Sequence, residues 1–351
     1  MERQKKIKIG ITQGDINGIS YEVIIKTLMD NRILDFCVPI VYGSAKVAAY
    51  HRKALNIENF SLNIVRDAEK ANVKKPNVVN CVDENIRVDL AKSAANAGEA
   101  AIQALDTAIE DLRQGKIDVL VTGPVNKENI QSENFDFPGH TEYLMNAFGS
   151  REALMLMVSD VMRVGVVTGH IPLKEVPGSL TQDLILKKLN ILNNTLIKDF
   201  KIRKPRIAVF GLNPHASDGG LMGKEENEII IPALQRAKDQ DIMAFGPYPS
   251  DGFFGSSNLR KFDAILAMYH DQGLAPFKAI AFDEGVNFTA GLDIVRTSPD
   301  HGTAYELAGK NEASPTSFRN ALFLALDIYR NRKEYRELTS NPLESQDNSD
   351  L

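Results

Sequence analysis

The sequence is poor in cysteine and has no long apolar runs. Only Cys37 and Cys81 occur among its 351 residues. Two thiols without a CxxC pair favour a reducing compartment without structural disulfides, so we expect the cytoplasm. No apolar run reaches the roughly 18 to 20 residues needed to span a bilayer. Residues 1–6 lead into a short apolar stretch without the h-region of a signal peptide.

Charge of one sign and two common nucleotide-binding motifs are also missing. The chain has 41 basic and 46 acidic residues, a formal net charge of −5, which argues against a nucleic-acid or anionic-membrane partner. No GxGxxG follows a predicted strand, so a Rossmann dinucleotide site is not indicated. The glycine-rich stretch 219–224 does not match GxxxxGK[ST], which argues against a P-loop ATPase or kinase.

What is present is a globular composition in which strand and helix patterns alternate. Hydrophobic residues make up 43% of the chain and charged residues 25%. Short apolar runs predict strands and amphipathic periodicity predicts helices, at 8–12, 38–43 and 118–123 for strands and at 22–28, 97–114 and 184–200 for helices. This order predicts an α/β fold with a mostly parallel, buried sheet.

The chain length suits two domains. The segment 127–137 is polar and loop-like, and 283–285 follows an apolar run. We therefore predict a discontinuous first α/β domain from 1–130 and 285–335. A second α/β domain then occupies 131–284, and 336–351 form a polar tail.

Three predicted strands lead into histidine, at His170, His215 and His270. In open parallel sheets the ligand crevice lies beyond the carboxyl ends of the strands, so these residues are candidates for one shared site. Three imidazoles with an open position form a catalytic arrangement for zinc and related ions. Each histidine taken alone also suits a capping or loop position. His51, beside Tyr50 and Arg52, is predicted to be a surface residue.

Several polar residues could bind an anion. His140 and Thr141 follow Pro138–Gly139 at the start of a predicted helix, where free amides favour phosphate or carboxylate, although Thr141 also suits a helix cap. Lys127 follows a strand and a tight turn, and Arg296 follows an apolar run. Lysine and arginine at such positions are otherwise ordinary surface charges.

Two aspartates are acid/base candidates. Asp251 lies in a Pro-Ser-Asp-Gly sequence, and Asp271 follows His270 directly. Equally, Asp251 suits a turn and Asp271 suits a partner that orients an imidazole ring.

Six segments of the sequence resemble the 4-hydroxythreonine-4-phosphate dehydrogenase family of vitamin B6 biosynthesis. They occur in the family's order over nearly the whole chain, to about residue 335, and are 11–19, 122–127, 139–142, 211–216, 267–274 and 296–304. The first segment departs from the family's Gly-Asp-Pro-x-Gly-Ile-Gly-Pro-Glu. It has Ile16, Ser20 and Tyr21 where the family has proline, glycine and proline.

The resemblance implies a fold and a set of site residues. The fold is that of isocitrate and isopropylmalate dehydrogenases, two α/β domains with an active-site cleft between them. These enzymes bind NAD without a Rossmann fingerprint. The implied groups are metal ligands at His170, His215 and His270, shared between two subunits of a homodimer; substrate contacts at His140, Thr141, Lys278, Asn287 and Arg296; cofactor contacts at Gly14, His301, Gly302 and Thr303; and catalytic groups at Lys127, Asp251 and Asp271.

The resemblance also implies a reaction. A divalent cation (zinc, magnesium or cobalt) lowers the pKa of the substrate hydroxyl, and a base, for which we favour Asp251, takes the proton. Hydride passes from C3 of 4-phosphooxy-L-threonine to NAD or NADP, and the keto acid loses carbon dioxide to give 3-amino-2-oxopropyl phosphate.

Three alternatives remain open on sequence grounds. The first is a dehydrogenase of 4-phospho-D-threonate or D-erythronate. The second is a metal-dependent hydrolase that uses three histidines to activate water. The third is a phosphate-ligand binding protein without catalysis. The segment His301-Gly302-Thr303-Ala304, which is similar to an adenosine-binding loop, favours the dehydrogenases.

Overall fold

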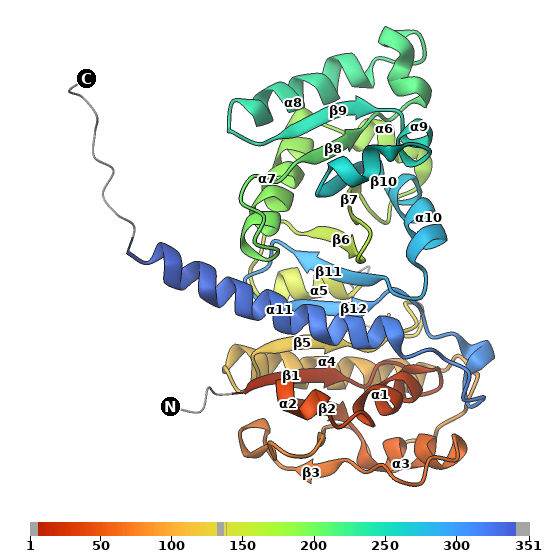
Figure 1. Ribbon diagram of the computed structural model, residues 1–351. Coiled ribbons are helices and arrows are strands. Elements are labelled where there is room, and N and C mark those ends of the chain that lie inside the picture. Colours follow the sequence, from red (N-terminus) through yellow and green to blue (C-terminus); the bar gives the residue numbers. More distant parts are fainter. Residues whose placement is uncertain (1–5, 132–136, 138, 342–351) are drawn as a thin grey trace.

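The computed structural model describes residues 6–131, 137 and 139–341. Their strands form one large sheet, which runs the length of the molecule (Figure 1). The strands are β1 (Ile7–Thr12), β2 (Cys37–Gly43), β3 (Asn63–Val65), β4 (Asn77–Asn80), β5 (Val119–Thr122), β6 (Leu154–Val158), β7 (Arg163–Thr168), β8 (Ile207–Phe210), β9 (Ala244–Tyr248), β10 (Ala264–Tyr269), β11 (Val286–Ala290) and β12 (Arg296–Pro299). Their order is β3-β4-β2-β1-β5-β12-β11-β6-β7-β10-β8-β9.

The sheet consists of two parallel blocks that run in opposite directions. One block holds β3, β4, β2, β1, β5 and β12, and the other holds β7, β10, β8 and β9. Between them, β11 pairs antiparallel with β12 and β6, and β6 pairs antiparallel with β7. Three successive antiparallel pairs reverse the direction of the second block. The predicted mostly parallel α/β sheet is therefore confirmed, with an antiparallel junction that periodicity alone did not show.

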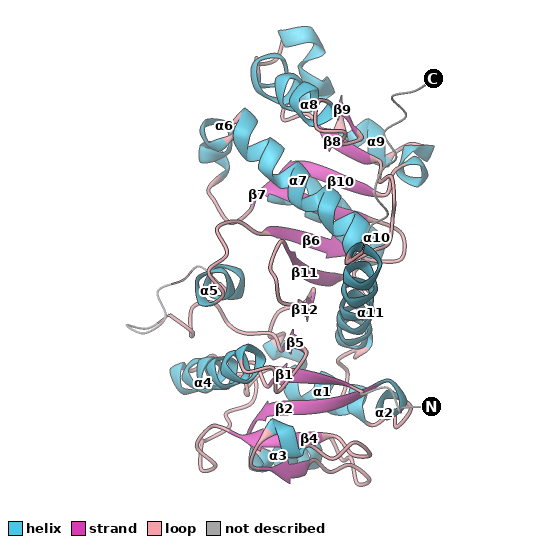
Figure 2. Ribbon diagram, turned by 90° about the vertical axis from the view of Figure 1, so that its left-hand side faces the viewer, coloured by secondary structure: helices cyan, strands magenta, loops and turns pink. Residues whose placement is uncertain are grey.

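Helices cover both faces of the sheet, and Figure 2 shows α4 and α11 on opposite sides of it. One face packs against α1, α7, α8 and α11, and the other against α4 in the first block and α10 in the second. The helices are α1 (Ser20–Leu28), α2 (Ile33–Phe36), α3 (Ala45–Ala54), α4 (Ala95–Arg113), α5 (His140–Ala147), α6 (Val176–Ser179), α7 (Gln182–Lys198), α8 (Ile231–Lys238), α9 (Ser250–Phe254), α10 (His270–Ala281) and α11 (Thr316–Thr339).

Local sequence explains why these helices form. In α4, Ala101, Leu105, Ala108 and Leu112 are buried at a spacing of three to four residues, so one face of the helix packs on the sheet. In α7 the side chain of Thr181 accepts a hydrogen bond from the amide of Leu184 and so caps the helix. Both helices begin and end within two residues of the predicted ranges 97–114 and 184–200, which confirms the amphipathic patterns.

The prediction that His51 lies on the surface is wrong. Its side chain is only 1% exposed, and its ring stacks on Tyr21 with a centroid distance of 5.2 Å. His51 Nε2 donates a hydrogen bond of 2.7 Å to the carbonyl oxygen of Ile16. Tyr21 and Ile16 are two of the positions at which this chain departs from the family pattern. The ring of Tyr21 and the carbonyl oxygen of Ile16 therefore hold the histidine beneath the β1–α1 loop.

The ends of the predicted segments are only partly described. Helix α11 continues to Thr339, so the first four residues of the predicted tail are helical, and 342–351 lie outside the described residues. The predicted loop 127–137 is likewise described only in part, because 132–136 are not included. The division into two domains stays a prediction, and the sheet is continuous across both proposed boundaries. None of the described helices is long and apolar enough to cross a membrane.

Candidate functional site

A cleft of about 270 Å³ lies on the sheet face where the two blocks join. Its floor is formed by β6, β11 and β12, its walls by α5 and α10, and further residues come from the loops after β5, β7 and β12. The predicted site residues that line it are Lys127, His140, Thr141, His170, His270, Lys278, Asn287, Arg296 and His301. The structure thus brings together residues that are up to 174 positions apart in the sequence.

Arg296, the first residue of β12, is a buried cation on the cleft floor. Its side chain is 4% exposed, and its guanidinium donates to the hydroxyls of Thr122 and Thr289 at 2.6 to 3.1 Å. No ion pair to Arg296 occurs within the described residues, although Glu142 acts on it from farther away. Burial lowers the pKa of Arg296 to about 10. An arginine that is held by neutral groups is a strong candidate to bind an anion.

His140 is the first residue of α5, as the sequence predicted for the start of this helix. Its Nδ1 accepts a hydrogen bond of 3.2 Å from Nη2 of Arg296, so the ring proton sits on Nε2. Burial and the nearby charges of Arg296 and Lys127 lower the pKa of His140 to about 3. Nε2–H is buried without a partner in the described structure. His140 is therefore a neutral donor that lacks an acceptor.

Two further predicted anion contacts lie in the same cleft. Thr141 occupies the second helical position of α5, and the helix cap is Gly139, so the alternative of a threonine cap does not hold. Asn287, at the start of β11, has a buried Oδ1 without a hydrogen-bond partner. Unpaired buried polar groups are costly, so their gathering around one cleft indicates that a polar ligand completes them.

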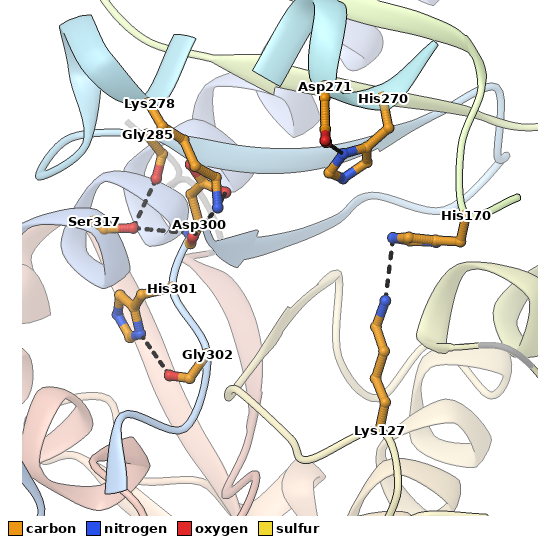
Figure 3. A network of polar contacts seen from close by, with 10 residues as sticks. All are labelled: Lys127, His170, His270, Asp271, Lys278, Gly285, Asp300, His301, Gly302 and Ser317. Carbon is orange, nitrogen blue, oxygen red and sulfur yellow. Dashed lines mark hydrogen bonds and ion pairs between the residues drawn. The ribbon is translucent and has the colours of Figure 1, made fainter. Parts of the chain in front are cut away.

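His170 and His270 follow two adjacent parallel strands, β7 and β10, and their rings lie close together (Figure 3). The ring centroids are 5.5 Å apart. His270 Nδ1 contacts Oδ1 of Asp271 at 2.7 Å, a pairing that fixes the orientation of the imidazole. Lys127 Nζ donates to Nε2 of His170 at 3.1 Å, which places the lysine beside that ring.

His215 and Asp251 lie outside the cleft of a single chain. Both side chains are exposed, on the loop after β8 and on α9. The loop that carries His215 has four consecutive left-handed residues that are not glycine, with φ between 44° and 68° for 215–218. Buried Glu226 accepts hydrogen bonds from the amides of Leu212 and Asn213, and so fixes the start of this loop. Backbone strain of this kind is concentrated at functional sites.

The residues present fit part of a metal site. His170 and His270 are two imidazoles at suitable positions, and a carboxylate orients one of them. Within the described ranges, no three His, Cys, Asp or Glu side chains lie close enough together to hold an ion. Within the described residues, these two imidazoles are therefore the ligands that the cleft offers to an ion.

The predicted cofactor residues meet where three loops join beside the cleft. Thr303 O accepts from the amide of Ile19 at 3.0 Å. Gly14 has φ of +64° and lies so close to Pro124 that a Cβ would come within 2.5 Å of its carbonyl oxygen. His301 Nδ1 donates to Gly302 O at 3.1 Å, which leaves Nε2 buried and unpaired.

Tyr305 ties these loops together. Its hydroxyl donates to Oδ2 of buried Asp15 at 2.7 Å and accepts from the amides of Asn126 and Asn129 at 3.3 and 3.4 Å. Burial raises the pKa of Asp15, and hydrogen bonds from Tyr305 and from the backbone amides of Asn17 and Gly18 oppose the shift. The β1, β5 and β12 loops are thus joined by one partly buried polar cluster.

The sequence interpretation did not assign two carboxylates of the cleft, Glu142 and Asp300. Asp300 forms an ion pair with Lys278, which α10 carries. Pro299–Asp300 has the composition of a turn, and this obscured the role of the aspartate. Its position between two candidate residues, Arg296 and His301, was the available signal.

A larger groove of about 530 Å³ lies between α7 and α11. Its central cation, Arg332, is already bound by Asp199 and by the carbonyl oxygens of 292–294. None of the unpaired buried atoms found in the described structure belongs to a residue that lines this groove. The groove therefore lacks the unpaired buried polar atoms that distinguish the cleft.

Comparison with known proteins agrees with this geometry. Residues 35–325 match the family model "Pyridoxal phosphate biosynthetic protein PdxA". A protein of Bacteroides thetaiotaomicron named 4-hydroxythreonine-4-phosphate dehydrogenase is 54% identical over 98% of this chain and 94% of its own length. An Oceanobacillus iheyensis relative, provisionally named a D-threonate 4-phosphate dehydrogenase, is 37% identical over 92% of this chain and 98% of its own length.

Solved structures show the same likeness. The crystal structure of 4-hydroxythreonine-4-phosphate dehydrogenase from Klebsiella pneumoniae has a TM-score of 0.81 and 31% identity, and covers 94% of this chain and 99% of that one. Isocitrate dehydrogenase from Methylococcus capsulatus, at 14% identity, has a TM-score of 0.50 and covers 95% of this chain and 89% of that one. This second match concerns the fold alone and confirms the predicted isocitrate dehydrogenase-like architecture. By sequence and by fold, the chain belongs to the PdxA family of pyridoxal phosphate biosynthetic proteins.

Proposed function

We propose that this protein oxidises 4-phosphooxy-L-threonine at C3 with NAD or NADP. Loss of carbon dioxide then gives 3-amino-2-oxopropyl phosphate, a step of pyridoxal 5'-phosphate biosynthesis. Family membership supports this function, as do the names of relatives that match nearly the whole chain. The proposal keeps the cytoplasm as its compartment, because Cys37 and Cys81 are free thiols.

The observation that carries the proposal is the unpaired guanidinium of Arg296. A buried charge is stable only when it is paired, and the described residues supply no partner carboxylate. A phosphate or carboxylate of the substrate would complete it. The neutral donor Nε2–H of His140 lies in the same cleft, and the ammonium group of Lys278 adds a second cation. These groups suit a small dianion.

Thr141 and Asn287 complete the proposed binding set. Both line the cleft beside Arg296, and Oδ1 of Asn287 lacks a hydrogen-bond partner among the described residues. A ligand that is held by several fixed groups is oriented as well as bound, so binding at the phosphate end positions C3 for hydride transfer.

The proposed catalytic groups are Lys127, Asp251 and Asp271. In a single chain only Lys127 lines the cleft, where its ammonium contacts His170. Asp271 orients His270 and is otherwise exposed. Asp251 is exposed on α9. Within one chain, Lys127 is therefore the proposed catalytic group that can contact a substrate hydroxyl in the cleft.

His170 and His270 would hold one divalent cation (zinc, magnesium or cobalt), with His215 of a second copy as third ligand in a homodimer. When bound, such an ion would supply Lewis-acid chemistry, polarising the substrate hydroxyl and stabilising negative charge on its oxygen. For the nicotinamide cofactor we propose the joined loops that carry Gly14 and 301–303.

An assay of NADH absorbance tests the proposed function. Substrates are 4-phosphooxy-L-threonine, 4-phospho-D-threonate and 4-phospho-D-erythronate, each with NAD and with NADP, and unphosphorylated 4-hydroxythreonine is the control. We expect turnover of the phosphorylated amino acid and little of the control, because the control lacks the phosphate that the cations of the cleft would bind.

The alternatives give different results with the same substrates when phosphate release and substrate binding are measured beside NADH absorbance. Preference for the phosphorylated hydroxy acids would favour the D-threonate reaction named for the Oceanobacillus relative. Phosphate release without nicotinamide would indicate a hydrolase, and binding without NADH would indicate a binding protein. Any of these three results would overturn the proposed reaction.

A further inference from the structure

The carboxylate of Asp300 and the ammonium of Lys278 form an ion pair at the cleft, with 3.3 Å between Oδ1 and Nζ (Figure 3). Nζ also lies 3.4 Å from the carbonyl oxygen of Asp300. An ammonium group has three N–H donors, so two face Asp300 and one remains for a ligand. The Asp300 side chain is 8% exposed and that of Lys278 is 41% exposed. The buried carboxylate therefore anchors the more exposed ammonium group.

Two hydrogen bonds fix the backbone of Asp300. Its amide donates to Oγ of Ser317 at 3.0 Å, and this hydroxyl donates to the carbonyl oxygen of Gly285 at 2.7 Å. Ser317 belongs to the first turn of α11, and Gly285 precedes β11 (Figure 3). The end of β12 is thus tied to two neighbouring elements at the point where Asp300 leaves the sheet.

Close packing against Gly285 fixes the side chain of Asp300. A Cβ at position 285 would lie 3.1 Å from Oδ2 of Asp300 and 2.8 Å from Cε1 of Phe277. Oδ2 itself is buried without a hydrogen-bond partner in the described structure. The carboxylate is therefore held by contact with the glycine backbone and by Lys278, at the cost of one unsatisfied acceptor.

We propose that Asp300 is a positioning residue that directs the ammonium of Lys278 toward the phosphate of the substrate. The inference rests on the proposed function. A lysine has a long flexible stem, so fixing its head before binding removes an entropy cost from substrate association. The carboxylate also repels a phosphate, but its charge is largely offset by Lys278 itself. Arg296 and Lys127 leave the cleft attractive to anions.

The test is the steady-state kinetics of D300A and D300N, with D327N as the matched control. Asp327 lies on α11, is exposed and is absent from the cleft lining. We expect KM for the phosphorylated substrate to rise about tenfold in D300A with kcat nearly unchanged, because positioning acts equally on ground and transition states. D300N keeps an oxygen for Lys278, so its KM should rise less. D327N should match the wild type.

A double-mutant cycle shows whether Asp300 acts through Lys278. In a K278M background, D300A should change KM by less than about twofold, since the group that it positions is gone. G285A provides a second approach, because the added methyl displaces the carboxylate without removing it. Its KM should shift in the same direction as that of D300A. Thermal melts confirm that each variant is folded.

The outcomes are distinguishable. If the wild type oxidises the substrate and D300A leaves its KM unchanged or lowers it, the positioning role is wrong. Equal effects of D300A with and without Lys278 would also refute it. If the wild type forms no NADH with any phosphorylated substrate, the proposed function fails first. In that case the binding of inorganic phosphate is the test. A dissociation constant about tenfold higher in folded D300A than in the wild type would still support the positioning role. An unchanged dissociation constant would refute it.

Discussion

Arg296 and His140 meet through a contact of 3.2 Å between Nη2 and Nδ1, and both are buried in a cleft whose described residues form no ion pair with the guanidinium. The pair links the floor strand β12 to the first residue of helix α5. Arg296 fixes the tautomer of His140, and His140 helps to hold Arg296 flat against the sheet.

Replacing Arg296 should separate function from stability. We expect R296M to lower kcat/KM for the phosphorylated substrate about a hundredfold, because it removes a charge-assisted hydrogen bond in a buried site. The melting temperature should stay the same or rise, since the variant no longer buries an unpaired charge. Kinetics and a thermal melt on one preparation measure both effects. Full activity in R296M would contradict the assignment.

Folding stability should fall as the pH drops below about 6.5, with His51 as one cause. Burial lowers the pKa of His51 from 6.5 to about 4. Between these values the unfolded chain binds a proton that the folded chain does not, so the stabilisation is present at neutral pH and is lost on acidification. Between pH 7 and pH 5 we expect His51 to contribute a loss of about 2 kcal/mol.

Urea unfolding of H51Q isolates this contribution. The variant should be less stable than the wild type at pH 7, because it loses the stacking on Tyr21, yet should lose less stability on going to pH 5. His140, with a pKa of about 3, shifts in the same direction and remains in both proteins. H215Q changes an exposed histidine and should keep the wild-type slope. Parallel slopes for wild type and H51Q would refute the role of His51.

Removal of divalent metal should silence turnover, and zinc, cobalt or magnesium should restore it. H215A should abolish NAD-dependent activity while the fold persists, although His215 lies outside the cleft of its own chain. Calorimetric titration of the metal-free protein with a divalent cation measures metal binding without relying on turnover. Normal activity in H215A, or after verified metal removal, would refute the metal role.

Mixed dimers test whether the metal site is shared between subunits. H170A and H215A are each expected to be inactive alone. If His215 acts in the partner's cleft, a mixture of the two variants contains dimers with one intact site, and part of the activity should return. Absence of recovery in dimers shown to be mixed would contradict sharing.

The hydroxyl of Tyr305 should matter for both stability and cofactor binding. Y305F leaves the buried carboxylate of Asp15 without its closest donor, so we expect the free energy of unfolding to fall by about 1 to 3 kcal/mol. Loosening of the three joined loops should also weaken NAD binding, measured by fluorescence titration. Y335F removes a hydroxyl on α11, away from these loops, and is the control. Unchanged NAD affinity in a destabilised Y305F would confine Tyr305 to a structural role.

Much of the fold could be predicted because local patterns determined it. The apolar runs at 38–43 and 118–123 are buried strands, and the amphipathic helix at 97–114 is α4. The strand ends at His170 and His270 were predicted to share a site, and β7 and β10 are indeed neighbours in the sheet. Periodicity of apolar residues carries this information without reference to distant segments.

The sequence by itself therefore determined the α/β class, the main elements, and most of the polar residues that line the cleft. The tertiary structure decided what depends on contacts between distant segments: the reversal of strand direction at β11 and β6, the burial of His51, and the pairing of Lys278 with Asp300. Residues such as Asp300 and Gly285 acquire their roles from neighbours that no local pattern identifies. The reason is physical: burial and contacts between distant segments set the partners of a residue, and for a charged side chain also its orientation and pKa.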